Sequence, residues 1–255
     1  MNTHAFPTAT PPNSGADPAA VTLADGVSVL WQDPHLGVVL KPSGLLSVPG
    51  RGPDKQDCLS KRLVHAGLPS MVVHRLDQAT SGLMLFARSA QMQRLLSHAF
   101  AQRQVHKQYL ACVAGQLPPS NDWQLIDAPI AADWPRRPLR VVANSGQSSQ
   151  TLWRSLGPCI CQTPEGATSG TWLVLRPLSG RTHQLRVHLQ HIGHPIEGDA
   201  LYAPPNVLAR SPRLMLHAQR LALTHPATGQ ALAFEHTPVG WLNPDMLRRA
   251  LAMPW

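Results

Sequence analysis

The chain has 255 residues, 43% of them hydrophobic, which is enough for a buried core in one large domain or two small ones. Its 22 lysines and arginines outnumber its 14 acidic residues, so the net charge is +8 and the pI is near 10. This balance favours a polyanionic partner such as nucleic acid, although a merely basic soluble enzyme would show it too.

The same bulk features exclude several classes of protein. No apolar run approaches the roughly 18 residues of a membrane helix, and the N-terminus lacks the basic and apolar regions of a secretory signal. The four cysteines have no CxxC spacing, which argues against a disulfide framework or a zinc site. We therefore expect a cytoplasmic protein with reduced thiols.

Residues 1–22 are rich in Pro, Ala, Thr and Asn and predict a disordered tail, followed by one folded domain over 23–255. Apolar patterning predicts short strands at 27–31 and 37–40 around the turn Asp33-Pro34-His35. A short helix is expected over 58–65, ending at Gly67.

The stretch "HRLDQATSG" (His74–Gly82) is a polar loop between two strand-like runs, Met71–Val73 and Leu83–Ala87. It carries a single carboxylate, Asp77. Taken alone, such an aspartate is explained by turn formation, because Asp, Thr and Ser bond readily to nearby backbone.

Ser89 is the expected N-cap of a helix whose apolar positions recur at one-turn spacing from Met92 to Phe100. A strand over 105–113 follows and contains "KQYLA", in which Lys107 and Tyr109 share one face. The tyrosine is either a half-buried core residue or an aromatic platform for a base, and spacing alone favours the core.

Residues 116–138 form a proline-rich excursion, and the basic motif "DWPRRPLR" (Asp133–Arg140) overlaps its end. Arginine pairs with phosphate and aromatic rings stack on unpaired bases. Together with the net charge, Trp134, Arg136 and Arg137 favour nucleic-acid binding over a solvated loop with one buried tryptophan.

The C-terminal half predicts mainly strands: 139–143 and 151–155 around the turn Asn144-Ser145-Gly146, then 171–175, then a hairpin of 214–224 with 230–235. Residues 161–170 are expected to be a surface loop. A helix is expected over 182–192, with Arg181 at its N-terminal end and Gly193 after it. Strands outnumber helices without a βαβ rhythm, which indicates an α+β fold on a mostly antiparallel sheet.

Four histidines in this region raise the alternative of a metal-dependent hydrolase: His183, His188, His191 and His194, with Glu197 and Asp199 nearby. Gly193 and Pro195 break the helix between these groups and no HExxH motif is present, so ordinary hydrogen-bonded histidines are favoured.

Taken in order, "HRLDQATSG", "KQYLA", "SGRTHQLRVH" (Ser179–His188) and "LMLHA" (Leu214–Ala218) resemble the successive motifs of the RluA-type pseudouridine synthases. The resemblance also includes "KPSGLLSVPG" (Lys41–Gly50), "DWPRRP" and "GHPIEGDALYAPP" (Gly193–Pro205). It covers nearly the whole chain after the tail. It implies the pseudouridine synthase catalytic fold, with flanking helices and a central RNA-binding cleft.

The resemblance further implies that the chain isomerises uridine to pseudouridine in hairpin loops of tRNA, in the anticodon loop, or of large-subunit ribosomal RNA, without cofactor or metal. Many relatives carry an additional N-terminal RNA-binding domain that has no counterpart here. We therefore expect the catalytic domain to bind structured RNA by itself, as a monomer without an obligate protein partner.

The resemblance also assigns roles to residues. Asp77 corresponds to the family's catalytic aspartate, Tyr109 to its active-site tyrosine and Arg181 to the basic residue paired with the aspartate. Arg75 resembles the arginine that replaces the extruded base, and Leu216 matches a position that lines the uracil pocket. Lys107 and the basic loop with Trp134, Arg136 and Arg137 are then expected to contact the RNA.

Chemistry gives these roles a reason. Breaking a glycosidic bond develops positive charge on the sugar, which an ionised carboxylate stabilises or attacks. A fixed guanidinium keeps a partly buried carboxylate ionised, so we predict a buried Asp77–Arg181 pair. A non-catalytic RNA-binding module with the same fold is the main alternative, and it predicts that Asp77 tolerates substitution.

Overall fold

The computed structural model describes residues 21–23, 26–163 and 166–253, which divide into two compact units. The first unit comprises the described residues up to 107 together with 218–236, and the second comprises 108–217 and 237–253. Strands β6 (His106–Ala114) and β12 (Leu216–Thr224) contain boundaries between them.

The first unit is built on a sheet in which hydrogen-bonded neighbours follow the order β1–β2–β3–β5–β12, with β13 on β12 and β4 on β5. Its other strands are β1 (Val21–Thr22), β2 (Ser28–Gln32), β3 (Leu36–Lys41), β4 (Met71–Val72), β5 (Ser81–Ala87) and β13 (Ala231–Glu235). The pairs β1–β2, β2–β3, β3–β5, β4–β5 and β12–β13 are antiparallel.

Most expected elements of this unit are confirmed, including the two early strands and the β12–β13 hairpin. The predicted tail was wrong for Val21–Thr22, which pair with Val29 and Ser28, because backbone pairing needs no large apolar side chain. Residues 1–20 of that tail lie outside the described residues.

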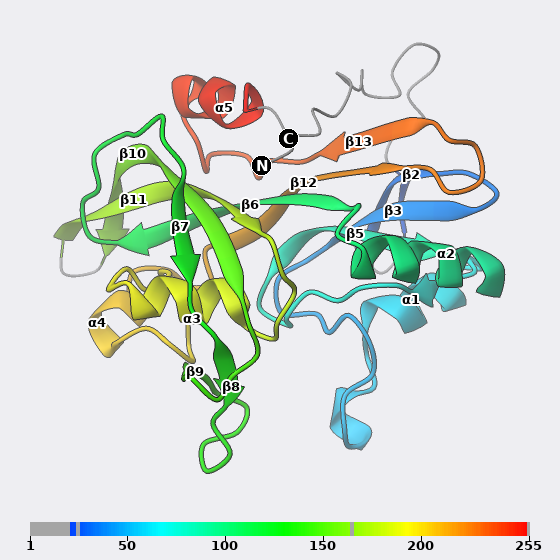
Figure 1. Ribbon diagram of the computed structural model, residues 1–255, viewed down its shortest axis with the longest axis horizontal. Coiled ribbons are helices and arrows are strands. Elements are labelled where there is room, and N and C mark those ends of the chain that lie inside the picture. The colour runs from blue at the N-terminus through cyan, green and yellow to red at the C-terminus, as the bar shows by residue number, and fades with distance from the viewer. Residues whose placement is uncertain (1–20, 24–25, 164–165, 254–255) are drawn as a thin grey trace. The chain divides into compact units, whose positions relative to one another are not determined.

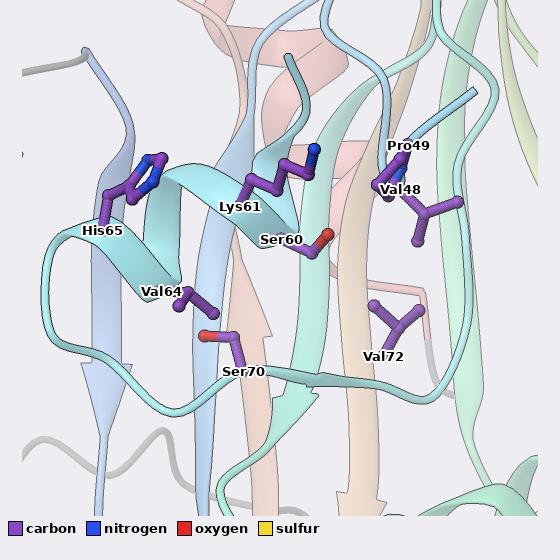
Figure 2. Close-up of a pocket in the computed structure, with 8 residues that line it drawn as sticks. All are labelled: Val48, Pro49, Ser60, Lys61, Val64, His65, Ser70 and Val72. Carbon is purple, nitrogen blue, oxygen red and sulfur yellow. The ribbon is translucent and has the colours of Figure 1, made fainter. Parts of the chain in front are cut away.

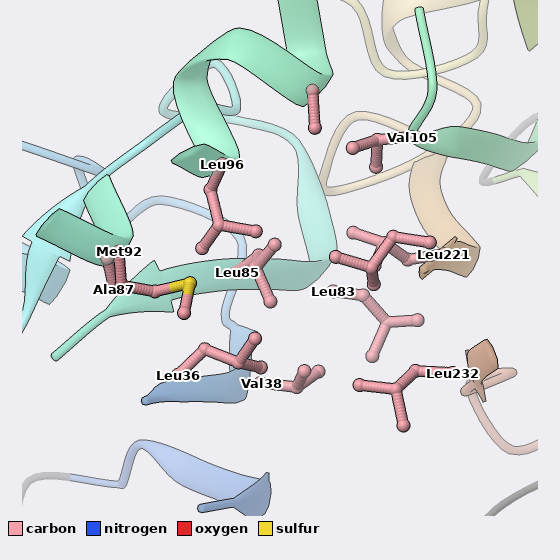
Figure 3. Close-up of a cluster of buried hydrophobic side chains, with 12 residues drawn as sticks. Leu36, Val38, Leu83, Leu85, Ala87, Met92, Leu96, Val105, Leu221 and Leu232 are labelled. Atoms are coloured by element: carbon pink, nitrogen blue, oxygen red, sulfur yellow. The ribbon is translucent and has the colours of Figure 1, made fainter. Parts of the chain in front are cut away.

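Three helical segments belong to this unit: the 3₁₀ turn Pro53–Lys55, α1 (Leu59–His65) and α2 (Ala90–Ala101). The hydroxyl of Ser89 accepts a hydrogen bond from the Met92 N–H, as expected of an N-cap. The apolar face of α2 packs on the sheet, and Figure 3 shows Met92 and Leu96 directed toward Leu85 and its neighbours.

This face belongs to a core of twelve buried side chains contributed by β3, β5, α2, β12, β13 and Val105. Full burial of one such leucine stabilises the fold by about 1.5–3 kcal/mol. The core therefore fixes β5, and with it the C-terminal end of the His74–Gly82 loop.

The second unit has a sheet of order β6–β11–β10–β7 and a separate two-stranded sheet, β8–β9 (Figure 1). The remaining strands are β7 (Gln124–Asp127), β8 (Ile130–Ala132), β9 (Arg140–Val142), β10 (Gln150–Thr163) and β11 (Gly166–Pro177). Its helices are α3 (Gln184–His191), α4 (Pro205–Leu208) and α5 (Pro244–Leu251).

The predicted surface loop at 161–170 was wrong for 161–163 and 166–170, which belong to strands, and residues 164–165 lie outside the described residues. The backbone of β10 runs to Thr163 and that of β11 begins at Gly166, and the antiparallel register continues to the pair Thr163↔Gly166. The two strands are much longer than the predicted segments 151–155 and 171–175. Gly, Thr and Ser in this stretch indicate a loop locally, but pairing between two long strands overrides that preference.

The strands on either side of Asn144-Ser145-Gly146 are confirmed, but they belong to different sheets. β9 pairs with β8, whereas β10 pairs with β7 and β11. The proline-rich stretch 116–138 contains the two short strands β7 and β8, which the sequence did not reveal. Gly146 lies so close to the backbone of Ile130 that a Cβ atom there would overlap it.

Two apolar clusters hold the second unit together. One joins β6, β10 and β11 to the C-terminal segment through Ala250 and Met253. The other packs the β8–β9 hairpin onto α3 through Ile130, Val187 and Tyr202. The hairpin with the basic sequence is therefore anchored on a helix.

Candidate active site

The loop from His74 to Thr80 connects β4 to β5, and its first residue is fixed to β5. The Nε2 atom of His74 accepts a hydrogen bond from the Leu85 N–H at 2.9 Å, and the ring stacks on Phe100 with centroids 4.6 Å apart. Desolvation and the positive charge of Lys107 lower the pKa of His74 to about 3. The imidazole is therefore neutral near pH 7, which an Nε2 acceptor requires.

Asp77 itself begins a turn, because the Thr80 N–H donates to the Asp77 carbonyl at 3.1 Å. The expected turn is thus present, but it spans 77–80, and Ser81 and Gly82 already belong to β5. The Asp77 side chain is half-buried and Arg75 is exposed.

A second segment, Lys41–Ser47, binds the backbone on both sides of Asp77. The Lys41 ammonium is fully buried and donates to the carbonyls of Pro42, Leu45 and Gln78 at 2.9, 2.6 and 2.9 Å. The hydroxyl of Ser47 donates to the Leu76 carbonyl and accepts from the Leu76 N–H.

Two further contacts complete this support. The hydroxyl of Ser43 donates to the Ala79 carbonyl at 2.7 Å, and Gly44 and Gln78 exchange hydrogen bonds. The residues immediately before and after Asp77 are therefore held by a neighbouring segment. Such contacts limit the positions that the Asp77 carboxylate can take, which is what a catalytic group requires.

Lys107 lies in the same unit with its ammonium 5.9 Å from the centroid of the Phe100 ring, and burial lowers its pKa. Lys107 thus contacts the Phe100 ring, which in turn stacks on His74 at the start of the loop. The predicted RNA contact of Lys107 remains a prediction.

The second unit holds the other residues that the sequence singled out. Tyr109 is 9% exposed on β6, opposite Leu175 of β11, so it is buried more deeply than the half-buried core residue that the strand pattern favoured, and its active-site role remains a prediction. The Cys112 N–H donates to the Met215 carbonyl, which places β6 beside the segment that leads into the buried Leu216.

Arg181 is exposed and lies two residues before His183, the N-cap of α3, so the helix begins at Gln184 and not at Thr182 as predicted. The Gln184 carboxamide oxygen accepts from the Arg181 N–H and the Ser179 hydroxyl, while its nitrogen donates to Gln150 and Thr151. The Arg181 backbone is thus tied to the start of β10. The predicted burial of Arg181 was wrong, because its side chain is exposed. Asp77 belongs to the other unit, so the pairing itself remains a prediction.

The β8–β9 hairpin, residues 130–142, carries the basic sequence in its loop and is called the basic hairpin below. Its side chains form an ordered surface. The Arg137 guanidinium lies 3.7 Å from the centroid of the Trp134 ring, which is 68% exposed. Arg136 pairs with Asp133, whose carboxylate accepts from the Arg136 Nε at 2.8 Å. Trp134 is therefore not the buried residue of the solvated-loop alternative.

Three of the four histidines that suggested a metal site, His183, His188 and His194, are engaged with protein groups. His188 donates through Nε2 to the Ala128 carbonyl, so its Nδ1 accepts from the Thr151 hydroxyl, and burial lowers its pKa. His183 and His194 bond to Tyr202 and to the Ala114 carbonyl. Within the described ranges, no three His, Cys, Asp or Glu side chains are grouped to hold a metal ion.

A cavity of about 510 Å³ lies beside α1 in the first unit and contains none of the predicted site residues. Figure 2 shows Val48 and Pro49 across from the α1 residues Ser60, Lys61 and Val64. None of the helices described is both long and apolar enough to traverse a lipid bilayer.

The sequence did not reveal the supporting roles of Lys41, His74 and Gln184, although all three lie in motifs that it singled out. For Lys41 a signal exists: a lysine that ends an apolar strand and precedes proline cannot easily reach water. The partners of Lys41 and Gln184 lie up to 37 residues away, and no local pattern identifies them.

Comparison with known proteins gives a consistent result. The model of the RNA pseudouridylate synthase family matches residues 35–191. The dual-specificity RNA pseudouridine synthase RluA of Yersinia pestis is 44% identical over 208 residues, which is 81% of this chain and 97% of that protein. The same enzyme from Escherichia coli K12 is 43% identical over 209 residues, with 81% and 91% covered.

Solved structures of the same class also match. Human RNA pseudouridylate synthase domain containing 1 superimposes with a TM-score of 0.71 at 26% identity, covering 89% of this chain and 96% of that one. Human RNA pseudouridylate synthase domain containing 4 gives 0.61 at 26% identity, covering 89% and 94%. Because the family model spans more than half of the sequence and the bacterial enzymes are over 40% identical along four fifths of it, the chain belongs to the RNA pseudouridylate synthase family.

Proposed function

We propose that this RNA pseudouridine synthase acts on uridines in hairpin loops of both tRNA, in the anticodon loop, and large-subunit ribosomal RNA, with Asp77 as its nucleophile. The similar bacterial enzymes are named dual-specificity RNA pseudouridine synthases, which supports the proposal that this enzyme modifies two kinds of RNA. The observation that carries the assignment of Asp77 is the set of hydrogen bonds from Lys41, Ser43 and Ser47 to the residues flanking it.

In the proposed reaction the Asp77 carboxylate attacks C1′ of the target uridine, and the bond from C1′ to N1 of uracil breaks with its electron pair on the base. The freed uracil turns and its C5 attacks C1′, which releases Asp77. The proton on C5 then leaves and N1 is protonated, so the product is an isomer and no cofactor is consumed.

The other residues have separate tasks in this proposal. Arg181 keeps Asp77 ionised, since a nearby guanidinium favours the charged form of a carboxyl group. Tyr109 stacks on the uracil and assists removal of the C5 proton, and Leu216 excludes water from the sugar. Arg75 occupies the space that the flipped base leaves, which offsets part of the few kcal/mol that unstacking costs.

The RNA outside the pocket is held by the basic hairpin and Lys107. The stacked pair of Trp134 and Arg137 offers an aromatic face and a guanidinium to an unpaired base and its phosphate. Hairpin loops suit this surface because their bases are already partly unstacked. We propose that the enzyme works as a monomer in the cytoplasm.

The test is release of tritium from RNA labelled at C5 of uracil, with purified protein and a chelator present. The wild-type enzyme is expected to release tritium from tRNA and from large-subunit rRNA of a strain that lacks the gene. Asp77→Asn should lower the rate by at least about a thousandfold while changing RNA affinity by less than about threefold.

Asp54→Asn, the same change at an exposed carboxylate of the 3₁₀ turn, serves as the matched control and should keep full activity. Retained turnover in Asp77→Asn would refute the nucleophile. RNA binding by the wild type without any release of tritium would favour the non-catalytic RNA-binding module. Loss of activity in chelator alone would favour a metal-dependent reaction.

A further inference from the structure

We propose that Tyr202 is a positioning residue. Its hydroxyl fixes the β8–β9 hairpin to the N-terminal end of α3, and so keeps Trp134 and Arg137 of the hairpin in a fixed position relative to Arg181. The proposal rests on the proposed function in one respect, namely that the hairpin binds RNA. Tyr202 does not touch the reacting atoms in this account.

The connection consists of two contacts to one oxygen atom. The Arg140 N–H, at the start of β9, donates to the Tyr202 hydroxyl at 3.0 Å. On the other side the hydroxyl lies 2.7 Å from Nδ1 of His183. His183 is the N-cap of α3, with a left-handed φ of 57°, and it follows Arg181 by two residues. One hydroxyl thus joins the end of the basic hairpin to the segment that carries Arg181.

The hydroxyl is a fixed point because the rest of Tyr202 is held independently. The residue is 7% exposed, and its ring packs with Ile130 and Val187. The Arg186 guanidinium lies 5.1 Å from the ring centroid and forms a buried ion pair with Asp199. The same Asp199 carboxylate accepts from the Tyr202 N–H.

The hairpin transmits this restraint to its tip. The Asp133 N–H donates to the Leu139 carbonyl at 3.1 Å and closes the loop at its base, and the Leu139 N–H donates to Arg136. Inside the loop, the pairing of Asp133 with Arg136 and the stacking of Arg137 on Trp134 leave little internal freedom. A change of orientation at Arg140 therefore moves the tip as a unit.

Removing only the hydroxyl separates this role from packing. In Tyr202→Phe the ring keeps its contacts with the apolar cluster and with Arg186. The strand on the other side of the hairpin stays tied to α3, because His188 donates to the Ala128 carbonyl. The variant is thus expected to fold, with a hairpin that is attached on one side only.

The experiment is a double-mutant cycle measured as tritium release from tRNA. Tyr202→Phe should raise KM about tenfold and change kcat by less than twofold, since two hydrogen bonds to a positioning group are lost. In the background of Arg137→Ala, which removes an RNA contact from the hairpin tip, the same substitution should raise KM by less than about twofold.

Thr171→Val is the matched control. Thr171 is fully buried in the same unit. Its hydroxyl donates to the Gly115 carbonyl and accepts from the Leu117 N–H, and neither partner belongs to the hairpin or to α3. It should lower the urea midpoint of unfolding as much as Tyr202→Phe does, with KM unchanged.

The outcomes are distinguishable. If Tyr202→Phe raises KM equally with and without Arg137, the Tyr202 hydroxyl does not position the hairpin, and the inference is wrong. A rise in KM in Thr171→Val would overturn it too, because loss of stability alone would then explain the effect. In both cases the hairpin could still bind RNA. A wild-type KM for Arg137→Ala would overturn the hairpin's role in RNA binding, and with it the inference.

Discussion

At the scale of the residue, the site depends on buried polar groups that act on backbone. Lys41 is the clearest case: a cation with no exposed surface gives its hydrogen bonds to three carbonyls. Hydrogen bonds from a charged donor are stronger than neutral ones, so this one side chain stabilises its own segment and joins it to Gln78, the residue that follows Asp77. The sequence predicted a role for Asp77 but not this support.

A residue-level prediction concerns His74 and pH. Its pKa is lowered to about 3 in the folded state from an ordinary value of 6.5, so the unfolded chain binds one more proton between these pH values. The neutral ring therefore contributes stability that is fully present above about pH 6.5 and is lost as the pH falls toward 3, by at most about 1.4 kcal/mol per unit.

The measurement is urea unfolding of the wild type and of His74→Gln between pH 4 and 7. Glutamine does not titrate, so the difference in unfolding free energy between the two proteins should shrink as the pH falls. A difference that stays constant across this range would show that His74 does not carry the assigned pKa shift.

At the scale of the element, the sequence predicted those helices and strands whose formation depends on residues close together in the chain. The α2 helix has its cap and its apolar stripe in the sequence, and both are confirmed. The β12–β13 hairpin follows from two strand-like runs around a turn. The 161–170 segment was predicted wrongly because its strand character comes from pairing along β10 and β11, and a register is a property of two segments.

The same limit applies to the site. The turn at Asp77 is local and was expected, whereas the contacts of Ser43 and Ser47 with Ala79 and Leu76 join segments about 30 residues apart. Composition gives no sign of such contacts. The order of the motifs predicts which residues take part in catalysis, and the structure shows how the first unit holds the backbone around one of them, Asp77.

An element-level prediction concerns Gly82, where the loop enters β5. Its φ is +121°, and a Cβ atom would overlap the backbone of Ala218 in the neighbouring strand. Gly82→Ala should therefore lower the free energy of unfolding by more than about 3 kcal/mol, because neither the conformation nor the contact tolerates a side chain.

Gly67→Ala is the control. Gly67 also has a positive φ, +76°, but a Cβ atom there meets nothing within 4 Å. Gly67→Ala should therefore lower the free energy of unfolding by about 1 kcal/mol, which is the strain of a left-handed backbone in alanine. Equal losses in the two variants, measured by urea unfolding, would show that the close approach to Ala218 is not what constrains this position.

At the scale of the whole molecule, the excess of basic residues is a physical account of RNA affinity. A net charge of +8 attracts RNA and releases its counterions on binding. The affinity for tRNA should therefore fall with salt, with a slope of about −0.7 in log K against log salt for each neutralised phosphate of an unpaired strand.

Arg137→Ala should reduce the magnitude of that slope by about 0.7 to 1. Arg248→Ala, at an exposed arginine of α5 that is paired with Asp245, removes the same charge and should leave the slope unchanged. Titrations between 50 and 200 mM salt measure both. Equal slopes for the two variants would mean that the hairpin neutralises no phosphate.

The most direct test of the central claim is to map pseudouridines in total RNA of a strain that lacks the gene, complemented with the wild type or with Asp77→Asn. Pseudouridines in hairpin loops of tRNA, in the anticodon loop, and of large-subunit rRNA should disappear without the gene, return with the wild type and stay absent with Asp77→Asn. An unchanged map without the gene, or restoration by Asp77→Asn, would contradict the account.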